Sequence, residues 1–116
     1  MSQGYGPLRT VLFANKIDDE TGVIVDVLGR TNITVYLQGT GTTSSGVITI
    51  EESCWIPGHE SESNSWASVA TVNASDASAG AQKVTRLTAG SYSQLRIRIS
   101  TVIGGGGSIT ARLTAQ

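Results

Sequence analysis

The sequence predicts an all-β fold: an antiparallel β-sandwich of about eight strands, jelly-roll-like, with an extended N-terminal arm. Three observations predict it. Apolar residues alternate with polar ones along most of the chain, clusters of Gly, Ser and Asn separate the alternating runs, and no segment has a helical period. Alternation with a period of two is the pattern of a half-buried strand, and glycine clusters between such runs indicate reversals. Their spacing along 116 residues is typical of a sandwich or barrel.

The first half of the chain is interpreted as an arm followed by four strands. Residues 1–9 contain Gly4, Gly6 and Pro7 and have almost no apolar pattern, so we expect an arm there and a single domain over 10–116. The predicted strands are 10–14, 22–28, 33–38 and 47–52, and the connections between them are 16–22, 29–32 and 39–46.

The second half begins with a long loop. Periodicity is lost from 54 to 65, and the next predicted strand, 66–72, starts at Trp66, which we assign to the core. Small residues at 73–80 indicate a turn, with a short helical turn as the alternative, and a strand follows at 84–87.

The last third of the chain is predicted to be a β-hairpin. Apolar Leu95, Ile97 and Ile99 alternate with polar residues, and the same pattern returns after four glycines. Cross-strand partners must share a face, so we expect Ile99 to pair with Leu113 around a loop at 105–107.

The composition excludes several classes of protein. A single cysteine, Cys54, rules out an intrachain disulfide, and we expect synthesis in a reducing cytoplasm. We see no signal peptide and no apolar run of the ~20 residues that a membrane span needs. A net charge of −1 argues against nucleic acid as a partner. The charges are uneven, however: all nine acids lie at or before Asp76, and five of the eight bases follow it.

The acidic and glycine-rich segments do not match known sites. The run Gly104–Gly107 lacks the lysine and helix of a phosphate-binding loop, so a turn is the better interpretation. The triplet at 18–20 lacks the spaced acids of a calcium loop. Glu51 and Glu52 are adjacent on a strand and point to opposite faces, so they cannot work as a pair of catalytic carboxylates.

Cys54 and His59 match no zinc-ligand spacing. We therefore predict no catalytic residue, no metal ligand and no cofactor, and we expect that the protein is not an enzyme. Trp55 lies in the same loop, where it either packs against one end of the sandwich or contacts a sugar or a partner protein.

Three arginines are predicted to share one polar face. Arg96 and Arg98 lie two residues apart, and the hairpin register places Arg112 diagonally opposite Arg98. Either they pair within the chain with Glu51, Glu52 or Asp26, or they form a basic stripe that docks on an acidic partner. The candidate partner-binding residues are Tyr5, Leu8, Arg9, Trp55, His59, Arg96, Arg98 and Arg112.

Three segments carry a resemblance to a known class of proteins. They are NITVYLQGTGTTSSGVITIEE at 32–52, SWASVATV at 65–72 and LRIRISTVIGG at 95–105. Together they resemble small β-sandwich structural proteins of tailed bacteriophages, over roughly residues 22–116. Such proteins commonly decorate the outer surface of the capsid as cement proteins, often as trimers, and relatives occur in tails and fibres.

The resemblance implies a non-enzymatic virion structural protein. We expect a capsid decoration protein that binds the major capsid protein as a homotrimer on the outer surface of the head, after synthesis in the host cytoplasm. The alternatives are a tail or fibre component and a carbohydrate-binding module that uses Trp55 and the loop 53–65. Neither nucleic acid nor a membrane is expected as a partner.

Overall fold

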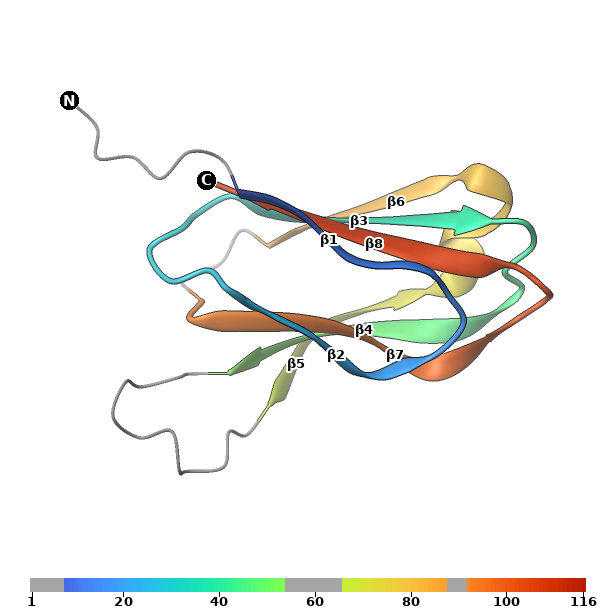
Figure 1. Ribbon diagram of the computed structural model, residues 1–116, viewed down its shortest axis with the longest axis horizontal. Helices are drawn as coiled ribbons and strands as arrows, with labels where there is room; N and C mark the ends of the chain where they lie inside the picture. Colours follow the sequence, from blue (N-terminus) through green and yellow to red (C-terminus); the bar gives the residue numbers. More distant parts are fainter. Residues whose placement is uncertain (1–7, 54–65, 88–91) are drawn as a thin grey trace.

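The computed structural model describes residues 8–53, 66–87 and 92–116, which form eight strands and a short 3-10 helical segment (Figure 1). The strands are β1 (Leu8–Lys16), β2 (Asp19–Asp26), β3 (Ile33–Thr40), β4 (Ser45–Ser53), β5 (Ala67–Asn73), β6 (Gln82–Leu87), β7 (Gln94–Gly104) and β8 (Ser108–Ala115). The helical segment η1 (Ala74–Gly80) confirms the short helical turn considered for this stretch. Nothing helical in the described ranges is long and apolar enough to span a membrane.

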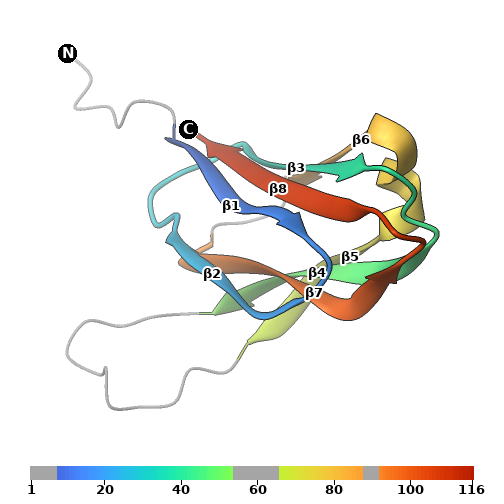
Figure 2. The same cartoon turned by 45° about the vertical axis from the view of Figure 1, so that its right-hand side comes forward.

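The strands form two four-stranded antiparallel sheets that face each other (Figures 1 and 2). Sheet A has the order β1-β8-β3-β6 and sheet B the order β2-β7-β4-β5. Successive strands change sheet except at β4 and β5, which are neighbours in both sequence and space. This order is that of a jelly roll, in which Greek keys make up a double sheet. The predicted all-β sandwich with jelly-roll character is confirmed.

The core lies between the two sheets and follows from the alternation of side chains. Val35 and Leu37 of β3 point inward and are fully buried, while the residues between and beside them point outward. Ile48 of β4 and Ile97 of β7 meet them from sheet B and are also fully buried. Each buried side chain of this size contributes ~1.5–3 kcal/mol relative to exposure, so the two inner faces hold the sandwich together.

The predicted final hairpin is wrong in its pairing. β7 and β8 are consecutive, but β7 pairs with β2 and β4 whereas β8 pairs with β1 and β3. Ile99 therefore lies opposite Ile48 of β4, and Leu113 lies opposite Val35 of β3. Alternation requires only that the apolar faces be buried, and two strands that face each other across a core satisfy it as well as two paired strands.

Two element boundaries differ from the prediction in ways that matter for binding. β1 begins at Leu8, so Leu8 and Arg9 belong to sheet A and not to an arm. β2 begins at Asp19, so the turn predicted over 16–22 is reduced to the connection Ile17–Asp18. An edge strand tolerates the polar residues that indicated a longer turn, because one side of it faces solvent. Residues 1–7 and 54–65, with Tyr5, Trp55 and His59, lie outside the described residues.

Candidate functional site

Charge is separated between the two sheets. The four strands of sheet A contain five bases and no acid: Arg9, Lys16, Lys83, Arg86 and Arg112. The four strands of sheet B contain two bases and five acids: Arg96, Arg98, Asp19, Glu20, Asp26, Glu51 and Glu52. The strands of each sheet are dispersed along the chain, so this separation arises only when the sandwich forms.

The outer face of sheet A presents its arginines among uncharged side chains. Arg9, Arg86 and Arg112 are all exposed. The strand register arranges the face in two rows, Arg9–Thr114–Thr34–Arg86 and Arg112–Tyr36–Val84. We call these seven residues the acid-free face. A surface of this kind attracts carboxylates and repels other cationic surfaces.

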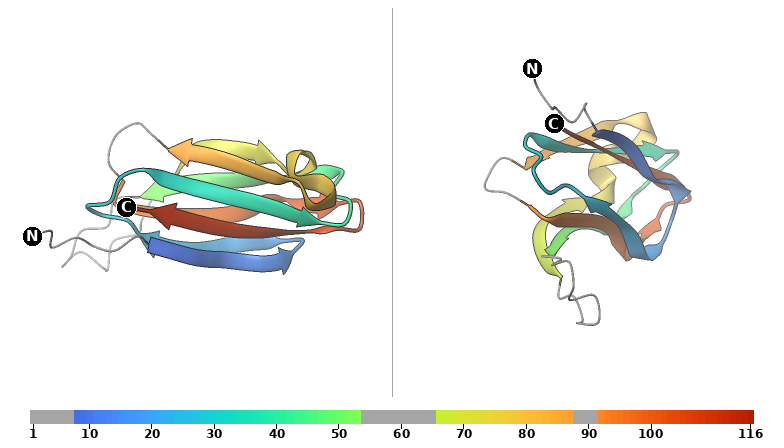
Figure 3. Two further views of the ribbon diagram at one scale, coloured as in Figure 1. Left: turned by 90° about the horizontal axis from the view of Figure 1, so that it is seen from above. Right: turned by 60° about the vertical axis from the view of Figure 1, so that its left-hand side comes forward.

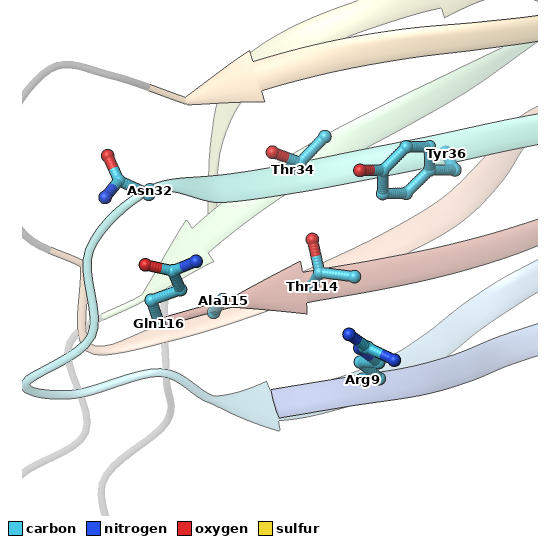
Figure 4. Close-up of a pocket in the computed structure, with 7 residues that line it drawn as sticks. All are labelled: Arg9, Asn32, Thr34, Tyr36, Thr114, Ala115 and Gln116. Atoms are coloured by element: carbon cyan, nitrogen blue, oxygen red, sulfur yellow. The ribbon is translucent and has the colours of Figure 1, made fainter. Parts of the chain in front are cut away.

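A hollow of about 470 Å³ lies on this face, where β3 begins and β8 ends (Figure 4). Its lining is Arg9, Asn32, Thr34, Tyr36, Thr114, Ala115 and Gln116. Paired backbone hydrogen bonds between Thr31 and Gln116, at 2.6 and 2.9 Å, close this end of the sheet. The lining offers a guanidinium, a phenol, hydroxyls and amides but no side-chain carboxylate, which suits an anionic or hydrogen-bond-accepting group.

Arg112 does not share a face with Arg96 and Arg98, so the predicted stripe of three arginines is wrong. Arg112 projects from sheet A, where it lies opposite Tyr36 of β3. Its Nη1 donates a long hydrogen bond of 3.4 Å to Oε1 of Gln38. The stripe depended on pairing β7 with β8, and those strands belong to different sheets.

Arg96 and Arg98 instead bind the same carboxylate oxygen on the outer face of sheet B. Nε of Arg96 donates to Oε1 of Glu51 at 2.6 Å, and Nε of Arg98 donates to the same oxygen at 2.9 Å. Glu51 lies directly opposite Arg96 in the β4–β7 register. Burial alone would raise the pKa of Glu51, but the hydrogen bonds from Arg98 and Arg96 outweigh it and hold the pKa below its usual range. The interpretation that these two arginines pair within the chain is confirmed for Glu51.

Trp66 lies beside this cluster and not in the core. The guanidinium carbon of Arg96 is 4.4 Å from the centroid of the Trp66 ring, a cation–π contact. Trp66 is half-buried and directly precedes β5, an edge strand whose side chains are mostly exposed or half-buried. The prediction that Trp66 lies in the core is wrong, because the edge strand β5 beside it buries few of its side chains.

The structure therefore divides the predicted binding residues into separate groups. Arg96 and Arg98 share the carboxylate of Glu51, whereas Arg9 and Arg112 lie on the acid-free face. Leu8 is half-buried at the start of β1. Within the described ranges, no three His, Cys, Asp or Glu side chains gather into a group that could hold a metal ion.

Sequence reasoning missed Thr34, Tyr36 and Arg86, which complete the acid-free face. Each is an ordinary outward position in an alternating strand. Their only signal is the absence of acids from four strands, and it becomes visible once those strands are known to share a sheet.

No protein-family model matches this chain, and no curated protein is significantly similar to it.

Proposed function

We propose that this protein is a non-enzymatic structural component of a phage virion, a decoration (cement) protein that binds the outer surface of the assembled head. The acid-free face is the observation that carries the proposal. The strands of sheet A contain no acid that could form an ion pair with its three arginines. A partner surface rich in Asp and Glu would therefore form charge-assisted hydrogen bonds with them. The resemblance to phage structural proteins supplies the candidate for that surface, the major capsid protein.

Stabilisation of the head would follow from mass action. A protein that binds the assembled shell and not its separate subunits shifts the equilibrium toward the shell. A homotrimer, as the resemblance implies, would present three such faces, and avidity would make weak individual contacts sufficient.

The same face would serve a tail or fibre component, the first alternative. Copy number per virion separates the two: a decoration protein is present in many copies spread over the head, and a tail component in few. A calibrated gel of purified particles measures it. A carbohydrate-binding module is the second alternative, and the hollow favours it because Tyr36, Thr34 and Asn32 could contact sugar hydroxyls.

A matched pair of charge reversals tests the contact surface. Arg112→Glu changes the acid-free face, and Arg98→Glu makes the same change on sheet B. Binding is measured by co-sedimentation with capsids of the source phage that lack this protein. We expect Arg112→Glu to bind less, with a deficit that grows as salt is lowered, because screening then no longer softens the repulsion.

Arg98→Glu should have the opposite profile. It places a second carboxylate beside Glu51, so it should lower the melting temperature and leave capsid binding unchanged at a temperature where the variant is folded. Normal binding of Arg112→Glu at low salt would refute the acid-free face as the contact surface. Absence of the wild-type protein from purified heads would refute the decoration role itself.

A further inference from the structure

In the part of the chain that the structure describes, the large exposed apolar side chains are concentrated on one side of the sandwich. Among the described residues, six large hydrophobic side chains are 44–68% exposed: Val11, Ile17, Val23, Ile24, Leu28 and Val102. The first five follow one another along β1, the connection to β2, β2 itself and the residues just after it. Val102 lies in β7 beside them, because its neighbour Ile103 donates a backbone hydrogen bond of 2.9 Å to the carbonyl of Ile17.

Five of these six residues lie on or next to the strands at which the two sheets end, and Val102 lies on β7, the strand next to β2. β1 is an edge strand of sheet A and β2 an edge strand of sheet B, and both lie on the same side of the molecule (Figure 3). We call β1, β2, their connection, Leu28 and Val102 the β1–β2 side. Its register is irregular, with shifts on either side of Phe13 and between Asp19 and Val23. Such shifts hinder continuation of a sheet into another chain, so contact through side chains is favoured over strand pairing.

The two strands of this side carry opposite charges. β1 contains Arg9 and Lys16 and no acid. β2 contains no base, and its Asp26 is exposed. A half-turn about an axis through this side exchanges the positions of the two strands, so β1 of one copy would face β2 of another. The side is therefore complementary to itself in charge, and it exposes apolar side chains at the same place.

We propose that the β1–β2 side is a self-association surface, in which β1 of one copy contacts β2 of the next. A second copy is the occupant that matches both observations, since one chain supplies both the basic strand and the acidic strand. A two-fold dimer and a closed head-to-tail ring both satisfy this contact. The surface adjoins the acid-free face, because Arg9 belongs to both and Val11 of β1 lies opposite Arg112 of β8. Ile17 and Ile24 lie outside the acid-free face, so substitutions there test self-association apart from attachment to a capsid.

The test is the solution mass of the full chain, measured by sedimentation velocity over a concentration series. We expect a multiple of the 12.0 kDa chain mass. The double variant Ile17→Thr/Ile24→Thr removes two exposed apolar side chains and keeps β-branched residues, so the strands should be retained. It should associate about tenfold or more weakly, the effect of losing apolar anchors from an interface.

The control is Val84→Thr, which also replaces an aliphatic side chain by threonine but lies on β6, at the opposite edge of sheet A. This variant should associate like the wild type. Lys16→Glu places an acid on β1, so it should also weaken association, most of all at low salt. Circular dichroism checks that each variant is folded. A monomeric wild type at all concentrations, undiminished association of the double variant, or equal weakening by Val84→Thr would each overturn the proposal.

Discussion

Replacing Glu51 with Gln removes the charge that holds Arg96 and Arg98 together, with almost no change in shape. Each arginine donates a charge-assisted hydrogen bond to Oε1 of Glu51, and the Glu51 side chain is only 9% exposed. Hydrogen bonds to buried charges contribute ~1.5–3 kcal/mol. The arginine side chains are 21% and 27% exposed, so water screens part of that amount, and we expect about 1 kcal/mol for each bond.

The loss of stability should therefore be about 2 kcal/mol in the free energy of unfolding. For a domain of this size, that corresponds to a fall of ~10 °C in melting temperature. The neighbouring Glu52 provides a matched control, because it is exposed on the same strand. Glu52→Gln should change the free energy of unfolding by less than about 0.5 kcal/mol. Thermal unfolding followed by circular dichroism at neutral pH gives both values.

The contribution of Glu51 to the stability of the fold should decrease as the pH is lowered. The pKa of Glu51 is lowered in the folded protein from 4.5, so its contribution is fully present above that value and is lost as pH falls through the folded pKa. The gap between the wild type and Glu51→Gln should therefore close in acid, because the other carboxylates titrate alike in both proteins. Equal melting temperatures for Glu51→Gln and Glu52→Gln at neutral pH, or a gap that persists in acid, would refute this reasoning.

Two further substitutions test how the end of β3 and the β3–β4 connection pack on η1. Oγ1 of the fully buried Thr43 donates to the carbonyl of Ala74 at 2.7 Å, so Thr43→Val should cost about 1–3 kcal/mol by leaving that carbonyl unpaired. A shift in the urea midpoint measures it, and an unchanged midpoint would contradict it. Gly39→Ala adds a Cβ against the backbone carbonyl of Ala77, so we expect a loss of ~1–3 kcal/mol, measured in the same way. Stability equal to the wild type would show that η1 can move aside.

The sequence by itself determined the fold class and the buried face of most strands. The alternation of Val35 and Leu37 with polar neighbours predicted a half-buried strand, and both residues are fully buried. The loop expected at 105–107 is also confirmed, and Gly105 and Gly106 adopt positive φ there. These features are local, because a strand's period and a turn's backbone conformation depend on residues that are neighbours in the sequence.

Only the tertiary structure decided which strands pair and which charges meet. The pattern at 95–114 fits paired strands and strands that face each other across the core equally well, and the packing of eight strands places β7 in sheet B and β8 in sheet A. That choice separates Arg112 from Arg98, brings Arg98 to Glu51, and gathers five bases on a sheet without an acid. The physical reason is that alternation specifies which face of a strand is buried. Which strands become neighbours in a sheet depends on how the buried faces of all eight strands pack together.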